Sequence, residues 1–291
     1  MGVTDMKPTR NPRLPIQGWI GLGMVAVFWP LNWLLPGVRS HWGFFSLWTG
    51  YSLLVDGWTY YRTGTSLFTR SWRKYLGLFA VSAPAWWLFE LLNWRVDNWH
   101  YIGKDQFSNL AYAALASLAF STVIPAVFGT AELVASTRFF KRPRRGPRIV
   151  PNRPTVLGFF LAGWIMLSLM LIWPRAFFPF LWLSVYFILE PLNIWSGNRN
   201  LAQWTQQGDW RPVYALWAGV LVTGFFWEFW NYWSYPKWIY TVPYLNCCHI
   251  FEMPLLGYGG YLPFALELHA LYHLVAGWFG DRDSDYIRLV S

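Results

Sequence analysis

Long runs of apolar residues, separated by short polar and basic segments, dominate the chain. A helix needs about 20 mostly apolar residues to cross the hydrocarbon core of a bilayer. The runs therefore predict an all-α integral membrane protein with about eight transmembrane helices. We place these helices at residues 17–37, 44–61, 75–95, 110–132, 155–173, 176–195, 214–233 and 261–279.

The positions of the basic residues predict the orientation of these helices. If the N-terminus is cytoplasmic, the alternating loops place most of the 23 Lys and Arg residues on the cytoplasmic side. Cytoplasmic loops of membrane proteins carry such an excess. We therefore expect both termini in the cytoplasm and the protein in a bacterial inner membrane. The first apolar run lacks a small-residue cleavage site, so we expect it to remain as a helix.

Composition and charge favour a membrane protein and exclude several partners. Hydrophobic residues make up 55% of the 291 residues and charged residues only 13%, whereas about 25% is typical of soluble domains. The net charge of +9 includes a basic run at 140–153. Anionic phospholipid headgroups would hold such a loop, so we expect no nucleic-acid partner. The chain lacks the glycine-rich motifs of nucleotide sites.

An internal repeat divides the chain into two halves. Glu90 and Glu228 are separated by the same number of residues as Asn93 and Asn231, and a second block pairs Asp56 with Glu190. Two copies with four helices each would be parallel repeats, related by an axis along the membrane normal. The predicted organisation is a basic N-terminus at 1–16, a first repeat at 17–137, a basic cytoplasmic linker at 138–154, a second repeat at 155–280 and a cytoplasmic tail at 281–291.

Acidic residues within the predicted helices are the first candidates for chemistry, because carboxylates are costly in lipid and commonly functional there. Glu90 and Asn93, like Glu228 and Asn231, share a helix face and fall in the outer third of the bilayer. We predict the two glutamates as acid/base residues and the two asparagines as residues that orient them. The alternative is a set of interhelical hydrogen bonds that only lock the halves together.

A second acidic layer is predicted in the inner third of the bilayer. It consists of Asp56 and Glu190, which lie on helices that run in the opposite direction. These two side chains could instead reach the cytoplasmic interface. The sequence leaves both interpretations open.

Tryptophan is unusually frequent, with 23 residues. Most of them are expected at the membrane interfaces, which suit amphipathic rings. A smaller group lies near the predicted acids and could form a slot for a flat or long apolar substrate. The predicted substrate-binding residues are Trp86, Trp87, Trp227, Trp230 and Tyr240.

The second half carries metal-ligating residue types that the first half lacks. Cys247, Cys248 and His249 precede the last predicted helix, and His269 and His273 share one face of it. Such a spacing suits two metal ligands on a helix, so a metal ion is a possible cofactor. Hydrogen bonding of the histidines within the bundle is the favoured alternative, because the two groups lie at different depths.

Residues 249–263 contain several Pro and Gly residues, and together with the last apolar run they are too long for one span. We expect a re-entrant or broken segment here that faces Glu90 and Glu228. Irregular backbone at membrane depth is tolerated where it is buried or lines a cavity. This segment adds Glu252 to the candidate catalytic residues. A Pro/Gly turn at the surface is the alternative.

Three short stretches resemble the membrane-embedded lycopene cyclases and related carotenoid-modifying enzymes. They are Phe89-Glu90, Glu190-Pro191 and Phe251-Glu252-Met253-Pro254. The resemblance implies intramembrane carboxyl groups that protonate a polyene. The adjacent Pro-x-Glu-Glu signature of a cyclase is missing, so the resemblance indicates a class of chemistry.

Three functions follow from these patterns. The first is an intramembrane enzyme that acts on an isoprenoid, a carotenoid or another lipid through buried carboxylates. The second is a proton- or metal-coupled transporter. The third is a subunit of a larger membrane complex that packs pigments, lipids or other membrane subunits. Confinement of the special groups to one half favours a single active site, and therefore the enzyme.

Overall fold

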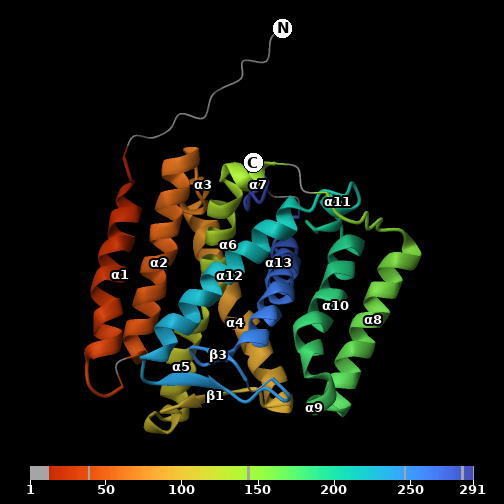
Figure 1. The fold of residues 1–291 in the computed structure, drawn as a ribbon. Helices are drawn as coiled ribbons and strands as arrows, with labels where there is room; N and C mark the ends of the chain where they lie inside the picture. Colours follow the sequence, from red (N-terminus) through yellow and green to blue (C-terminus); the bar gives the residue numbers. More distant parts are fainter. Residues whose placement is uncertain (1–12, 39, 143–144, 246, 283–284, 291) are drawn as a thin grey trace.

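The computed structural model describes residues 13–38, 40–142, 145–245, 247–282 and 285–290. Parts of the predicted N-terminus, linker and tail, at 1–12, 143–144, 283–284 and 291, lie outside the described residues. All the predicted apolar runs are helical, and the helices form one bundle (Figure 1). The long helices are α1 (Ile16–Leu34), α2 (Ser40–Thr63), α4 (Trp72–Val96), α5 (Asn109–Phe120), α6 (Val123–Ala135), α8 (Arg153–Ile172), α10 (Leu181–Trp195), α12 (Arg211–Tyr232) and α13 (Tyr261–Trp278).

Short elements connect these helices. At the end of the bundle where α4 ends, two chain segments form a small antiparallel sheet, which the apolar pattern did not predict. The short elements are α3 (Leu67–Arg70), α7 (Arg138–Lys141), α9 (Pro174–Phe177), α11 (Ala202–Thr205), η1 (Lys104–Gln106), η2 (Phe178–Phe180), η3 (Leu255–Gly260), β1 (Trp99–Ile102), β2 (Lys237–Tyr240), β3 (His249–Ile250) and β4 (Met253–Pro254). The predicted broken segment thus forms β3, β4 and η3 before α13 begins.

Within the described residues, five helical segments are long and apolar enough to cross a membrane. They are Trp72–Val96, Asn109–Ala135, Arg153–Ile172, Pro174–Trp195 and Arg211–Tyr232. The outer faces of the bundle are also apolar, as the half-exposed side chains of Leu161 and Ile165 on α8 illustrate. A soluble protein rarely exposes such a continuous apolar surface. The fold class is therefore that of an all-α integral membrane protein.

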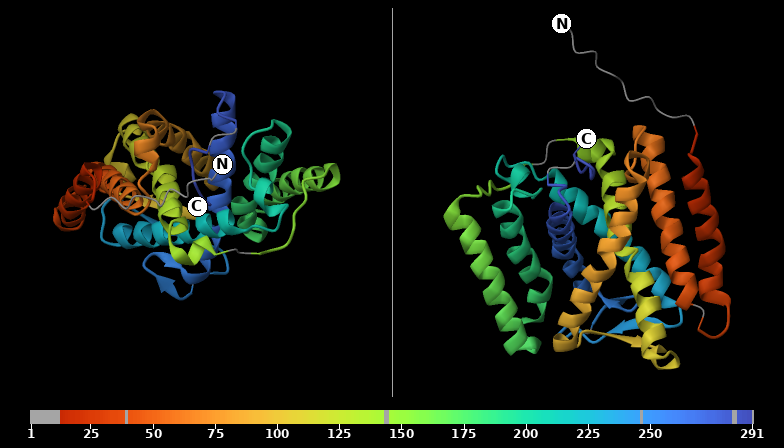
Figure 2. Two further views of the ribbon diagram at one scale, coloured as in Figure 1. Left: turned by 90° about the horizontal axis from the view of Figure 1, so that it is seen from above. Right: turned by 180° about the vertical axis from the view of Figure 1, so that it is seen from behind.

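The bundle places α1 and α2 at one side and α8 and α10 at the other, with α12 and α13 between them (Figure 2). Helix α12 passes very close to α6. A Cβ atom added at Gly219 would lie 2.7 Å from the Cα atom of Ala131. Small residues allow such close backbone approach, which drives packing between helices in membranes. This contact joins the two halves of the chain.

The two acids of the predicted inner layer each cap a short helix in their own half. Asp56 Oδ1 accepts a hydrogen bond from the Phe68 backbone N–H (2.9 Å), at the start of α3. Glu190 Oε1 accepts one from the Leu201 backbone N–H (2.5 Å), at the start of α11. Unpaired N–H groups at a helix start are stabilised by such acceptors. Both side chains are buried, and these hydrogen bonds hold each of them to its own connecting segment.

Candidate active site

The ends of α4 and α12 are built in the same way, and this construction positions the candidate site. Asn93 donates from Nδ2 to the Trp99 carbonyl (2.9 Å) and accepts from the Asn98 backbone N–H (2.9 Å). Asn231 donates to the Trp238 carbonyl (2.7 Å) and accepts from the Trp238 N–H (2.9 Å). Each buried amide therefore fixes the strand that follows its helix.

The two strands fixed in this way pair with each other. In the antiparallel register of β1 and β2, Trp99 lies opposite Tyr240 and Tyr101 lies opposite Trp238. The sequences Trp-His-Tyr and Trp-Ile-Tyr thus face each other in opposite directions. Both strands lie across the end of the bundle opposite α3 and α7 (Figure 1).

Glu90 receives three hydrogen bonds from side chains around it. Its Oε1 atom accepts from Trp86 Nε1 (2.9 Å), Trp99 Nε1 (3.0 Å) and Tyr101 Oη (2.5 Å). Two of these donors come from β1. Burial, followed by the nearby Glu90 carboxylate, raises the pKa of Tyr101 well above its ordinary value. The phenol is therefore a neutral donor at physiological pH.

Glu228 has a matching but less complete environment. Its Oε1 atom accepts from Tyr240 Oη and from Tyr261 Oη, both at 2.7 Å. The residue is fully buried, and its Oε2 atom has no hydrogen-bond partner among the described residues. Burial, followed by the Glu228 carboxylate, raises the pKa of Tyr240 well above its usual value. This phenol also remains a neutral donor.

A cavity of about 180 Å³ lies between these two groups. Its walls come from both halves of the chain, and they are strongly aromatic. Within them, Trp182 stacks on Trp99 with a centroid distance of 5.8 Å and an interplanar angle of 25°. The aromatic wall includes Trp86, Trp99, Tyr101, Trp182, Trp227, Tyr240 and Tyr261. Because several of these residues donate to Glu90 or Glu228, each carboxyl group lies one hydrogen bond behind the wall.

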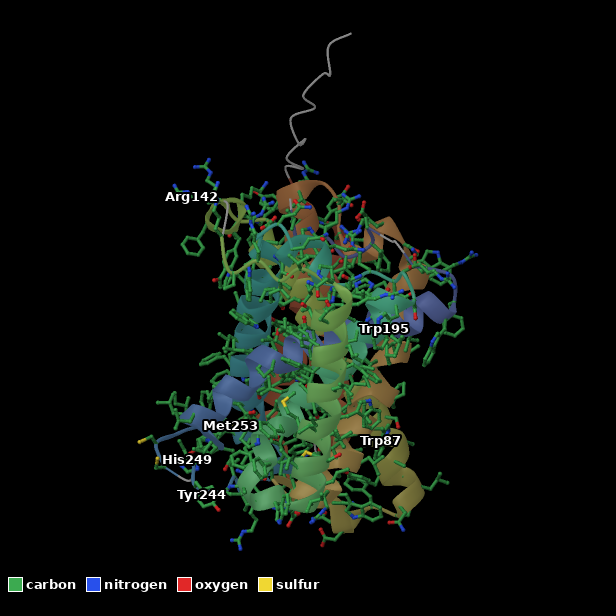
Figure 3. All side chains as sticks on the ribbon, turned by 90° about the vertical axis from the view of Figure 1, so that its right-hand side faces the viewer. Trp87, Arg142, Trp195, Tyr244, His249 and Met253 are labelled. Atoms are coloured by element: carbon green, nitrogen blue, oxygen red, sulfur yellow. The ribbon has the colours of Figure 1, made fainter. Side chains whose placement is uncertain are left out.

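Three of the five predicted substrate-binding residues line this cavity, namely Trp86, Trp227 and Tyr240. The other two do not. Trp87 donates its indole N–H to Ser117 Oγ (2.9 Å), and Figure 3 shows it on the other side of the bundle from Met253. Trp230 is buried in the core, where its ring contacts Trp48 at 5.0 Å. Trp87 is adjacent to Trp86 on α4 and therefore points in a different direction, whereas Trp230 packs against Trp48 and Tyr51 of α2.

The predicted catalytic asparagines and Glu252 take positioning roles. Asn93 and Asn231 bond the strand backbones rather than the carboxylates, so they orient the acids only through the strands that carry the phenol donors. Glu252 forms an ion pair with Lys237, and both are partly exposed. Lys237 also lines the cavity. The ion pair therefore fastens the β3–β4 segment to β2 beside the aromatic wall.

The predicted metal ligands are not brought together. His249 is exposed on β3, beside the exposed thiols of Cys247 and Cys248. His269 and His273 are buried within α13, with ring centroids 4.4 Å apart. Among the described residues, no group of three or more His, Cys, Asp or Glu residues could hold a metal ion. The length of the η3–α13 segment separates the two predicted groups.

Several residues of this site were not predicted from the sequence. Trp99, Tyr101 and Tyr261 supply hydrogen bonds to the two acids, and Trp182 forms part of the wall. The sequence does contain a signal for Trp99 and Tyr101, because a Trp-x-Tyr sequence follows Asn93 and another follows Asn231. Nothing in the local sequence distinguishes Trp182 or Tyr261 from other aromatic residues.

No protein-family model, no curated protein and no solved structure matches this chain.

Proposed function

We propose that this protein is an intramembrane enzyme that acts on an unsaturated lipid of the isoprenoid or carotenoid class. One observation carries the proposal. The carboxyl groups of Glu90, which is partly buried, and Glu228, which is fully buried, stand behind opposite parts of a single aromatic cavity, and phenol and indole groups connect them to it. An apolar cavity with a few convergent polar groups is the usual form of a binding site for an apolar ligand.

The geometry favours proton transfer to and from a carbon–carbon double bond. A proton from Glu228 would reach the substrate through the hydroxyl of Tyr240 or Tyr261, and a cation would remain on the substrate. Faces of Trp and Tyr rings stabilise a cation at close range. Glu90, reached through Tyr101, would take a proton from a neighbouring carbon. The net reaction is an isomerisation or cyclisation in which nothing is oxidised or reduced.

The assignment of the two roles rests on their hydrogen bonds. Three donors converge on Glu90 Oε1, and donors of this kind stabilise an ionised carboxylate, which can accept a proton. Glu228 leaves one buried oxygen without a donor. That oxygen suits the form that carries the proton. We therefore assign Glu228 as the acid and Glu90 as the base.

We also propose that the long helices, with α5 and α6 counted as one segment, cross the membrane eight times as two parallel four-helix repeats. The shared Asn–strand construction and the reciprocal β1–β2 register support a pseudo-twofold axis through the sheet. The start of α1, the linker and the chain's last described residues lie at one end of the bundle. This end carries most of the basic residues. We place it in the cytoplasm of a bacterium, against anionic headgroups, and the cavity near the outer surface.

Substitution of the two acids tests the enzymatic proposal. We expect Glu90→Gln and Glu228→Gln to lower product formation by about 100-fold or more, because a general acid or base contributes that much. Their thermal stability should change little, since Gln keeps an acceptor for the same donors. The measurement compares lipid extracts, by chromatography and mass spectrometry, from polyene-producing cells that express each variant.

Asp105→Asn is the matched control, because Asp105 is an exposed acid near the same end of the bundle. It should convert substrate like the native protein. If both Gln variants remain fully active, the acid/base roles are wrong. If both variants instead lose their fold or their partner subunits, the two acids serve assembly, as expected of a structural subunit.

A further inference from the structure

A second cavity lies at the other end of the bundle, between α8, α10 and α12. Its volume is about 260 Å³. Most of its wall is apolar, with Val156 and Phe159 from α8 and Val213 from α12. It shares no lining residue with the aromatic cavity. An inference about it therefore does not depend on the proposed reaction.

The basic linker between the two halves covers part of this cavity. The Ile149 backbone N–H donates to the Thr205 carbonyl (3.1 Å), and Trp210 Nε1 donates to the Pro147 carbonyl (2.8 Å). Ile149 and Pro151 line the cavity directly. The linker is thus docked on the α11 segment, and two of its residues form part of the cavity wall.

Glu190 supplies the carboxyl group among the residues that line this cavity. One of its oxygens caps α11, but Oε2 has no hydrogen-bond partner among the described residues. The residue is only 2% exposed, so water does not cover this oxygen freely. A buried polar atom without a partner costs about 1–3 kcal/mol. A bound group that supplies the missing hydrogen bond would recover that cost.

Asp56 is the equivalent acid in the first half, and both of its oxygens have donors. Capping of the short helix therefore does not require an oxygen without a partner. Asp56 accepts from the Phe68 N–H through one oxygen and from Ser66 Oγ (2.8 Å) through the other. In the second half, Asn200 stands at the position of Ser66, and its Nδ2 atom donates to the Asn198 carbonyl instead (2.8 Å). The internal donor has been lost only where a cavity adjoins the acid.

A second unpartnered polar atom specifies the ligand further. Trp217 also lines the cavity, and its Nε1–H has no acceptor among the described residues. A hydroxyl group both donates and accepts, so it can satisfy Glu190 Oε2 and the indole N–H. A phosphate or carboxylate headgroup would find no Lys or Arg among the lining residues, and a pure hydrocarbon would satisfy neither atom.

We propose that this cavity binds a long-chain alcohol of the membrane, with its hydroxyl group at Glu190 and Trp217 and its chain along the apolar wall. The hydroxyl of a membrane alcohol lies near the headgroups, which is the depth expected of Glu190 near the basic end of the bundle. The basic linker beside Glu190 would hold the hydroxyl end of the alcohol in place.

Photo-crosslinking in lipid nanodiscs tests this proposal. The probe is hexadecanol with a diazirine in its chain, and labelled peptides are mapped by mass spectrometry. We expect labels in 155–159, 186–194 and 213–217. Unlabelled hexadecanol should compete about threefold to tenfold better than hexadecane, the effect of one hydrogen bond.

Two variants locate the site, and one provides a matched control. Thr155→Phe fills the cavity from the first turn of α8 and should lower labelling severalfold. Leu157→Phe places the same ring on an exposed position of the same helix and should leave labelling unchanged. Glu190→Met removes the acceptor at similar volume and should abolish the preference for the alcohol over hexadecane. If Glu190→Met impairs folding because α11 loses its cap, Thr155→Phe still tests whether the cavity binds the alcohol.

Three results would overturn the proposal. The first is labelling spread evenly over lipid-facing helices, which would indicate adventitious partition only. The second is equal competition by hexadecane. The third is much stronger competition by hexadecylamine, which would identify a cationic ligand.

Discussion

At the residue scale, a buried asparagine controls the geometry of each acid indirectly. Asn231 makes two hydrogen bonds to the backbone of Trp238, and this strand carries the phenol that donates to Glu228. The carboxylate and the asparagine share a helix face, yet they do not bond each other. The asparagine therefore fixes the position of the strand, and the strand in turn carries the phenol that donates to the acid.

Replacement of this amide tests its positioning role. Asn231→Ala should lower the free energy of unfolding by about 1–3 kcal/mol, because it leaves buried backbone groups without partners. It should also lower turnover more than substrate affinity, since Tyr240 loses its fixed position. Thermal unfolding and steady-state kinetics measure the two effects. Asn109→Ala, at an exposed position, is the control. Equal effects on kcat and KM would contradict a positioning role.

At the element scale, short connecting segments fix the ends of the long helices. The segment before α12 is an example. Asp209 Oδ1 accepts from Arg211 Nε (2.9 Å), and the backbone of Asp209 forms an isolated antiparallel β-bridge with Arg145 of the linker. Hydrogen bonding by the Arg211 side chain holds the pKa of Asp209 below its usual value. The ionised aspartate thus fixes Arg211 at the start of α12, next to the backbone contact with the linker.

This pair predicts a pH dependence. Because the pKa of Asp209 is lowered in the folded state, its stabilisation is present above the unfolded pKa of about 3.9 and is lost as the pH falls below it. Native protein should therefore be more stable than Asp209→Asn at neutral pH, with a difference that is lost as the pH falls through the lowered pKa of Asp209. Thermal unfolding across this pH range measures it. A difference that persists in acid would exclude the ion pair as its cause.

At the scale of the whole molecule, the candidate site exists only where the two halves meet. The cavity lining combines α4, α5 and β1 with β2, α10, α12 and α13, and the close contact of α12 with α6 sets how the halves fit. Neither half alone would enclose a cavity between two acids.

A bulky residue at the contact between the halves should therefore impair folding. Gly219→Leu is expected to cost at least about 1–3 kcal/mol, because a side chain there would overlap the α6 backbone. Gly158→Leu is the control, since a Cβ atom at Gly158 meets nothing within 4 Å. Reversible unfolding in mixed micelles compares the two variants. Equal stability of both would show that the halves do not depend on this contact.

The sequence by itself determined the class of the protein and the positions of its helices, because lipid requires long apolar helices whose backbone groups are satisfied internally. It also identified Glu90 and Glu228, because carboxylates within apolar runs are conspicuous. The tertiary structure decided which aromatic residues face the cavity, since helix rotation is set by packing and not by composition. It also decided that Asp56 caps a helix, because that contact joins residues across a chain reversal whose path depends on the packed bundle.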